Sequence, residues 1–166
     1  MSKDDARDKL WKIISGTKFA MLTHRHGSGQ LHSQPLTTQN KELGDDSMLY
    51  FFVQKDGDVA RHVLTDANVN LAYANVDDDD YVSVSGKASM SEDQALKKSL
   101  FNTIAKAWFP GGAEDPNLGL LAVHIEQAEL WQAKDTKVVQ LLKMAASAVT
   151  GEPPKDMSEH RKLANP

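Results

Sequence analysis

Three histidines near the start of the chain are the first side chains whose spacing could support chemistry. His24 and His26 are alternate residues that would share one face of a strand, and His32 follows in the same region. Imidazole groups gathered in this way could ligate a metal ion. The sequence offers no Asp or Glu motif to complete such a ligand set, so we do not predict a metal site. No serine stands in the G-x-S-x-G context of a nucleophile, and no serine nucleophile is predicted.

The most informative stretch of the chain is residues 108–117, Trp-Phe-Pro-Gly-Gly-Ala-Glu-Asp-Pro-Asn. Pro110 must end the helix that precedes it, because proline lacks the amide proton and clashes with the preceding turn. The two glycines that follow allow a sharp reversal of the chain. A surface loop needs no pair of large aromatic residues, so we expect Trp108 and Phe109 to pack on a flat surface.

Composition narrows the classes of function. The chain has 166 residues, 40% of them hydrophobic, which suits a single domain with its own core. A net charge of −4 argues against binding nucleic acid or an acidic membrane surface. The absence of cysteine excludes disulfides, thiolate metal sites and cysteine nucleophiles. No apolar stretch approaches the roughly 20 residues that span a bilayer, and the N-terminus lacks an apolar signal region, so a soluble cytoplasmic protein is expected.

Hydrophobic periodicity and turn signals predict an antiparallel β-barrel with peripheral helices. Six or seven strands follow one another in hairpin order, without the strand–helix–strand repeats of a parallel sheet. Residues 1–150 are expected to form this domain, and the polar tail 151–166 is expected to be mobile. The predicted helices are 4–15, a short one between 56 and 68, 91–108 and 136–149, and the predicted strands are 19–24, 30–38, 48–53, 69–76, 81–90, 118–127 and 128–133.

Several short motifs occur in an order and spacing that resemble the general stress protein 26 group of the pyridoxamine 5'-phosphate oxidase-like flavoproteins. The motifs are His-Ser-Gln-Pro-Leu at 32–36, Leu-Tyr-Phe-Phe at 49–52, the loop at 108–117, Ala-Glu-Leu-Trp-Gln-Ala at 128–133 and Lys-Val-Val at 137–139. The resemblance covers roughly residues 4–151. It implies an FMN-binding split barrel that pairs as a homodimer, with the cofactor in the cleft between the subunits.

The resemblance implies that the second strand passes beside the flavin ring, at Ser33, Gln34 and Pro35. An isoalloxazine needs a flat apolar slot with a few polar groups at its edge, and the ribityl chain needs hydrogen bonds. The family commonly has an arginine at the position of Gln34, whereas this side chain is neutral and could only hydrogen-bond. The alternative is an ordinary strand in which Pro35 marks an edge or a bulge.

The third strand is the second candidate for contact with the cofactor. In the family this strand runs along the flavin at Phe51, Phe52 and Val53, and it uses backbone groups more than side chains. The strand then leads into a helix whose start holds the phosphate, which needs lysine, arginine or free backbone amides.

Lys55 and Arg61 are the cations near the expected phosphate site. The family often has a serine and a lysine in this region, and here the lysine position reads Val59. Asp56 and Asp58 instead place two negative charges where a phosphate dianion would bind, which opposes its binding. The alternative is a helix start that is simply capped by aspartate.

Two tryptophans form the third candidate. The resemblance implies that Trp131, in the Glu-Leu-Trp motif, lies close to the cofactor or to the dimer seam, and Trp108 is grouped with it. Trp131 alternates with Leu130 along a strand, so one of the two faces out of the core. An outward tryptophan suggests ring stacking or an interface, and the alternative is plain packing in the core or the dimer.

The sequence therefore leaves three functions open. The first is an FMN-binding, stress-related protein, with two-electron transfer at the flavin N5 and a small-molecule electron donor or acceptor if it is an oxidoreductase. No catalytic acid or base is assigned. The second is a non-enzymatic binder of flavin or another small molecule, with the same fold and weak or lost FMN affinity. The third is a structural dimer without a ligand.

Overall fold

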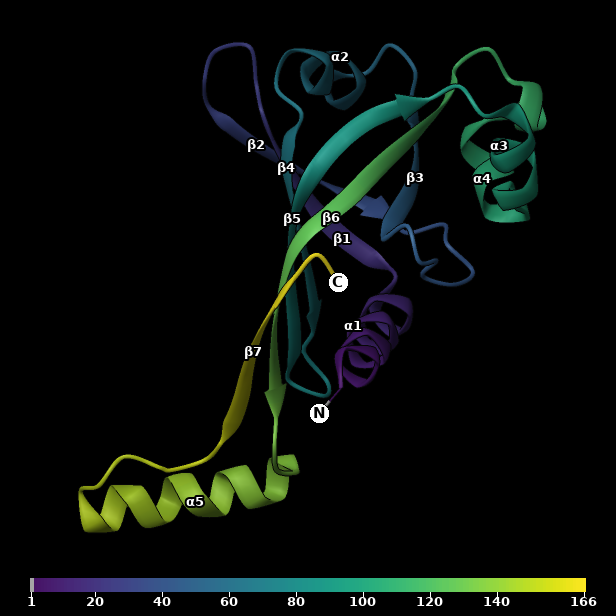
Figure 1. Ribbon diagram of the computed structural model, residues 1–166. Helices are drawn as coiled ribbons and strands as arrows, with labels where there is room; N and C mark the ends of the chain where they lie inside the picture. Colours follow the sequence, from purple (N-terminus) through teal and green to yellow (C-terminus); the bar gives the residue numbers. More distant parts are fainter. Residues whose placement is uncertain (1) are drawn as a thin grey trace.

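The computed structural model describes residues 2–166, which form a curled antiparallel sheet of seven strands with five α-helices around it (Figure 1). This confirms the predicted antiparallel split barrel with peripheral helices. In chain order the elements are α1 (Lys3–Thr17), β1 (Phe19–Arg25), β2 (Leu31–Thr37), β3 (Met48–Gln54), α2 (Asp58–Thr65), β4 (Asn68–Asn75), β5 (Asp80–Ser91), α3 (Gln94–Leu100), α4 (Thr103–Trp108), a 3-10 turn (Gly112–Glu114), β6 (Leu118–Ala133), α5 (Lys137–Thr150) and β7 (Ser158–Ala164).

The strand order is β2-β1-β4-β5-β6-β3, and β7 pairs with the outer end of β6. The two ends of this order, β2 and β3, approach each other through a single bridge between Thr38 and Phe51. The sheet therefore curls almost into a barrel and leaves a split beside β2 and β3. Because the interior of so small a barrel must be filled by side chains, alternate residues of each strand point into one core.

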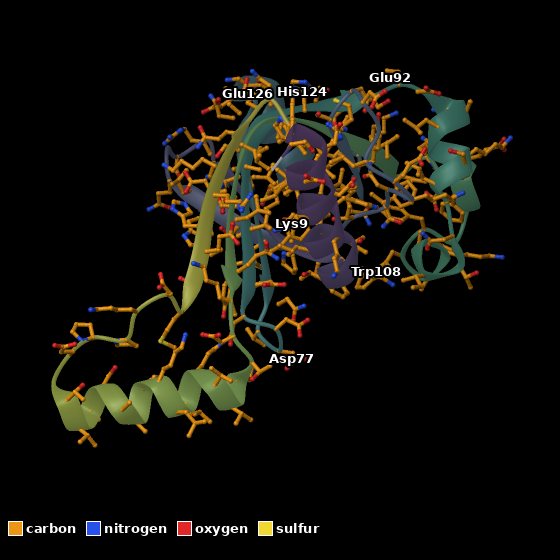
Figure 2. All side chains as sticks on the ribbon, turned by 60° about the horizontal axis from the view of Figure 1, so that its bottom comes forward. Lys9, Asp77, Glu92, Trp108, His124 and Glu126 are labelled. Carbon is orange, nitrogen blue, oxygen red and sulfur yellow. The ribbon has the colours of Figure 1, made fainter. Side chains whose placement is uncertain are left out.

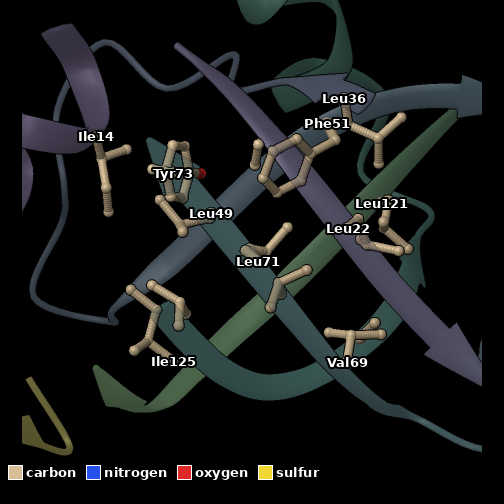
Figure 3. Close-up of a cluster of buried hydrophobic side chains, with 14 of the residues drawn as sticks. Ile14, Leu22, Leu36, Leu49, Phe51, Val69, Leu71, Tyr73, Leu121 and Ile125 are labelled. Atoms are coloured by element: carbon tan, nitrogen blue, oxygen red, sulfur yellow. The ribbon is translucent and has the colours of Figure 1, made fainter. Parts of the chain in front are cut away.

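The core is built from these inward residues, with α1 covering one end (Figure 3). Leu22, Phe51 and Leu71 are completely buried. Tyr73 is also buried, and its hydroxyl lies 2.7 Å from that of Thr38, which satisfies the polar atom. Burial raises the pKa of the Tyr73 hydroxyl above its ordinary range. This tyrosine is therefore a neutral structural residue.

The first helix follows the sequence signals closely. Ser2 accepts a hydrogen bond from the amide of Asp5, and the Asp5 carboxylate accepts one from the amide of Ser2, which together make a capping box. Leu10 and Ile14 form part of the buried face of the helix, at the spacing that the sequence predicts.

The single helix predicted over 91–108 is wrong, because the structure breaks it into α3 and α4. Phe101 is extended, and the side chain of Asn102 accepts a hydrogen bond from the amide of Ala105. Asparagine favours such an N-cap over a helix interior, so it starts a new helix. The N-cap of α3 is Asp93, so this helix begins later than the predicted start at residue 91.

The two strands predicted at 118–127 and 128–133 are one continuous strand, β6. The register with β5 shifts between Ser85 and Gly86, because Ser85 pairs with Gln127 and Gly86 pairs with Ile125. Glu126 is thus an extra residue, a β-bulge that lets the strand bend without ending. This bend allows β6 to pair with β3 at one end and with β7 at the other.

The C-terminal residues differ from the prediction of a mobile tail. The segment 151–166 is polar, as expected, but residues 158–164 form β7 on the edge of β6. Beyond this strand, the amide of Asn165 donates to the carbonyl of Glu126 at 2.7 Å. Pairing with β6 gives the backbone of this polar segment its hydrogen bonds, which polar composition alone does not reveal.

Helix α5 projects away from the body of the molecule (Figures 1 and 2). None of its residues is buried, and Val138, Leu141, Leu142 and Val149 are exposed. Its start is fixed by the Lys137 amine, which donates to a carbonyl in the β4–β5 turn at 3.0 Å. Among residues 2–166, no helix combines the length and the apolar character needed to cross a membrane.

Candidate functional site

The outer face of the sheet, which points away from the core, carries a line of hydroxyl and amide side chains. The strand registers place Ser33, Thr23, Asn70 and Ser85 next to one another across β2, β1, β4 and β5. The hydroxyls of Thr23 and Ser33 lie 2.6 Å apart, and the Asn70 amide donates to Ser83 at 2.8 Å. We call Ser33, Thr23, Asn70, Ser83 and Ser85 the polar row. It offers both donors and acceptors to a ligand on this face.

A cavity of about 590 Å³ lies on the same face at the far end of β5 and β6. Tyr81 and Trp131 are register partners and form its aromatic wall. We call this cavity the aromatic pocket. The pocket is lined by the β4–β5 turn, β5, β6, α5 and the residues where β7 begins: Asp79, Tyr81, Trp131, Ala133, Gln140, Met157 and Ser158. Flat aromatic and apolar walls with a few polar groups are typical of a small-molecule site.

The ring of Trp131 is also covered by the C-terminal strand. His160 on β7 stacks on it, with ring centroids 4.9 Å apart and planes 5° apart. The Nε2 atom of His160 lies 3.2 Å from the carboxylate of Glu129, and Lys162 pairs with the same carboxylate at 3.2 Å. Hydrogen bonds from Lys162 and His160 lower the pKa of Glu129, so this carboxylate stays charged.

A second hollow of about 330 Å³ borders the polar row at the β1–β2 end. Arg25 and Asp66 pair across it at 3.3 Å. Hydrogen bonds from Asn68 and from Arg25 lower the pKa of Asp66. The rim of this hollow is therefore charged, but its positive group, the Arg25 guanidinium, is already paired with Asp66.

The second-strand candidates divide between the two faces of the sheet. Ser33 belongs to the polar row, and Pro35 shares its face. Gln34 points to the opposite side with Leu22, its register partner, and is half-buried. A ligand on the outer face could therefore contact Ser33 and Pro35 directly, but not the side chain of Gln34.

The third-strand candidates lie mostly in the core. Phe51 and Val53 are buried, with exposed fractions of 0% and 5%. Phe52 points the other way and packs near Phe101, with ring centroids 6.0 Å apart. Any contact of Phe51 or Val53 with a ligand would therefore have to use backbone groups, as the resemblance implies.

The start of α2 carries the two candidate phosphate-binding cations. Lys55 has an exposed side chain and a backbone amide fixed on the carbonyl of Asn117 at 2.8 Å. Arg61 is exposed but ion-paired with Asp58 one turn earlier, and that hydrogen bond lowers the pKa of Asp58. The N-cap is Gly57 and not an aspartate, and its helix start has no side-chain cap. Lys55 is thus the less encumbered of the two cations.

The aromatic loop differs from expectation at one residue. Phe109 is buried, as predicted, whereas Trp108 on α4 is 75% exposed and does not pack down within this chain. Buried Asp115 holds the loop by accepting hydrogen bonds from the amides of Gly111 and Asn117, both at 2.9 Å. Two hydrogen bonds to Asp115 thus hold the loop that follows α4, and Trp108 at the end of this helix faces outward.

Within one chain the predicted site residues do not gather around a single cavity. Ser33 and Pro35 lie on the outer face of β2, and Trp131 lies in the aromatic pocket at the other end of the sheet. Lys55 and Arg61 flank the start of α2. Sequence reasoning missed Tyr81, Asn70, Met157 and His160; strand alternation could have placed Tyr81 and Asn70 on the outer face.

A curled antiparallel sheet with a polar row and an aromatic pocket on its outer face defines a split-barrel protein with a candidate small-molecule site. The family described as pyridoxamine 5'-phosphate oxidase like matches residues 5–155. The chain therefore belongs to the pyridoxamine 5'-phosphate oxidase-like family, which confirms the resemblance given by the short motifs. Strand β7 begins beyond the matched residues.

Known proteins of this kind are similar over most of the chain. General stress protein 26 of Bacillus subtilis is 26% identical over 144 residues, which cover 85% of this chain and 99% of that protein. The structure of the general stress FMN/FAD binding protein from Xanthomonas citri is 28% identical, with a TM-score of 0.69, and the match covers 80% of this chain and 92% of that one. A protein from Jannaschia sp. CCS1, assigned to general stress protein 26, shares the fold with a TM-score of 0.77 at 23% identity, over 97% of this chain and 99% of that one.

Proposed function

We propose that this protein binds flavin mononucleotide on the outer face of its sheet. The observation that carries the proposal is the combination of the polar row with the aromatic pocket on that face. Family membership supports it, and the Xanthomonas citri relative is named for binding FMN or FAD. Flavin bound there would supply two-electron transfer at its N5 atom.

The residues present fit two of the three parts of the cofactor well. The ring needs a flat apolar surface, which Tyr81 and Trp131 provide, and the ribityl chain needs the hydrogen bonds that the polar row offers. The phosphate needs cations, and here the fit is poorer because Asp58 already pairs with Arg61. We therefore assign the phosphate chiefly to Lys55.

We further propose that two copies of the chain complete the site as a homodimer. The outer face exposes Phe19 and Met21 beside the polar row, with exposed fractions of 64% and 44%. Helix α5 adds an apolar face that no part of the described segment 2–166 covers. A second copy would bury these surfaces, and it could bring the aromatic pocket of one chain to the phosphate end of the other.

A flavin-dependent oxidoreductase with a small-molecule electron donor or acceptor is the finer form of this proposal. The alternative is a flavin binder without turnover. The Asp58–Arg61 pair favours the alternative, because it weakens the hold on a phosphate dianion, and the inward-facing, neutral Gln34 adds no cation to the outer face. No described side chain is assigned as a catalytic acid or base.

The test is a titration of the purified protein with FMN and then with riboflavin, followed by flavin fluorescence. Sedimentation of the same samples gives the oligomeric state. Tighter binding of FMN than of riboflavin, by a dimer, supports the proposal, and oxidation of NADH or NADPH then separates an enzyme from a binder. A protein that binds neither flavin would contradict it.

Lys55→Ala is expected to weaken FMN binding about tenfold and to leave riboflavin binding unchanged, since a lost charge-assisted hydrogen bond costs about 1.5 kcal/mol or more. Lys106→Ala, which removes an equally exposed lysine from α4, serves as the matched control and should change neither affinity. Equal weakening of both flavins by Lys55→Ala would remove this lysine from the phosphate site.

Asp58→Asn provides the reciprocal variant for the same titration. It removes the carboxylate that pairs with Arg61 and leaves the backbone of α2 in place. We expect FMN to bind several-fold more tightly and riboflavin to bind as before, because an exposed charge interaction of this kind is worth up to about 1 kcal/mol. Unchanged FMN affinity would mean that the start of α2 does not face the phosphate.

A further inference from the structure

Four of the six histidines of the chain meet at one end of the barrel. His24 on β1 and His32 on β2 are register partners, His26 lies in the turn that joins these strands, and His62 lies on α2. The ring centroids of His24 and His62 are 5.2 Å apart, and those of His26 and His62 are 4.4 Å apart. The rings of His26 and His32 are stacked at 4.3 Å. These rings form the contact between α2 and the β1–β2 turn, which lie side by side in Figure 1.

The hydrogen bonds of this four-histidine cluster offer its buried ring nitrogens no acceptor among residues 2–166. The Nδ1 atoms of His24 and His62 are buried, and neither has a hydrogen-bond partner within residues 2–166. The Nδ1 atom of His26 accepts a hydrogen bond from the amide of Ser28 at 3.1 Å. The residues described contain no three His, Asp or Glu side chains that are arranged to hold a metal ion.

A positive charge inside the cluster finds little compensation. The carboxylate in electrostatic reach is that of Asp58, which is already paired with Arg61 on α2. Beside the turn, Arg25 is likewise paired with Asp66. The inward residues of β3 and β5, against which α2 packs, are apolar. Two protonated rings in contact would therefore repel each other in a poorly solvated place.

His24 is the ring whose environment opposes protonation most clearly. It is 97% buried by surface area, since its exposed fraction is 3%. Burial, and then the neighbouring His62 and His32, lower its pKa below the ordinary 6.5, and a backbone hydrogen bond at Arg25 offsets only part of this. Because the pKa of His24 is lowered in the closed contact, its ring binds a proton more readily when the contact is open. The free energy that holds the contact closed is then fully present above about pH 6.5 and falls as the pH decreases further.

We propose that the four-histidine cluster is an acid-sensitive latch that holds α2 on the β1–β2 turn. In neutral solution the rings pack together and keep α2 closed over the end of the barrel. In acid the ring of His24 takes up a proton in this uncompensated place and α2 is released, while the rest of the sheet stays paired. The latch depends on no ligand and is independent of the flavin proposal.

The test is amide hydrogen exchange between about pH 8 and about pH 5.5, expressed as protection relative to an unstructured chain. If opening takes up one proton, protection in α2 falls by at most tenfold per pH unit below the ordinary histidine pKa, so a loss of up to about tenfold is expected. The centre of β5 and β6 should keep its protection over this range. Equal protection of α2 at both pH values would overturn the proposal.

His62→Phe keeps an aromatic ring against His24 but removes the charge repulsion between the two rings, so it should reduce the acid-induced loss in α2. His124→Gln changes an exposed histidine on β6, outside the cluster, and should leave the loss as in the unmodified protein. If His62→Phe does not fold, His32→Phe on the exposed side of the cluster should reduce the loss instead. A variant with the same acid response as the unmodified protein would contradict the latch.

Metal binding is the competing explanation, and it is tested with Zn²⁺ alone. The latch predicts that Zn²⁺ at neutral pH leaves the melting temperature and the protection of α2 unchanged. If Zn²⁺ raises both in the unmodified protein and neither in His62→Phe, the cluster is a metal site after small ring rotations, and the latch proposal is overturned.

Discussion

Gly86→Ala is expected to lower the free energy of unfolding by about 3 kcal/mol or more, one of the two largest effects that we predict. A Cβ atom at this position would lie 2.1 Å from the backbone carbonyl oxygen of His124. Real Cβ atoms do not approach a carbonyl so closely, and a backbone atom in a paired strand cannot swing aside. The clash falls at the register shift where β6 bends, so the bend itself would have to change. Urea unfolding followed by circular dichroism measures the loss.

Gly16→Ala is the matched control for this substitution. Gly16 lies in α1 with open space around its would-be Cβ, so alanine should raise stability by up to about 1 kcal/mol. A Gly86→Ala protein within about 1 kcal/mol of the parent would show that the close approach of β5 and β6 is not rigid. The β-bulge in β6 would then not result from the close approach of the two strands at this glycine.

Phe51→Ala is expected to lower the free energy of unfolding by about 3–5 kcal/mol. The ring of Phe51 is completely buried at the centre of the core, close to Leu121 across the β3–β6 pair (Figure 3). Its removal leaves a cavity that the surrounding strands cannot fill, because they are held by the sheet hydrogen bonds. Urea unfolding measures this loss as well.

Phe52→Ala separates the structural role of this strand from a role in binding. Phe52 is only half-buried, so its removal should cost less stability than that of Phe51. The folded fraction of the Phe51→Ala protein should bind riboflavin like the parent, because the ring that is removed faces the core in the parent. A specific loss of riboflavin binding at unchanged stability would instead place Phe51 in the ligand site.

Local patterns predict much of this fold. The glycine-containing turn between β1 and β2 gives the bounds of both strands within one residue, and apolar periodicity gives α1 within two residues at each end. These features depend on residues that are close together in the chain, so composition and periodicity are enough to predict them. The sequence does not reveal the break at Asn102, because the apolar residues on both sides of it continue the helical spacing. This spacing outweighs the preference of a single asparagine for a helix cap.

Features that depend on distant partners could not be predicted in this way. Strand β7 is polar and becomes a strand only because the edge of β6 is available to it. His62 lies far along the chain from His24, so the four-histidine cluster is invisible without the fold. The candidate flavin residues pose the same difficulty, because their side chains lie on different faces and ends of the sheet, and their roles stay predictions.

The pairing of β3 with β6 also has a consequence for how the protein is made. Residues 48–54 leave the ribosome well before their partners at 118–124, and about sixty residues separate the two strands. At translation rates of about 5–20 residues per second, the apolar strand β3 waits roughly 3–12 s for β6 to be synthesised. During that interval Leu49, Phe51 and Val53 have no finished core to enter. Nascent chains of this protein should therefore be clients of ribosome-associated chaperones until β6 emerges.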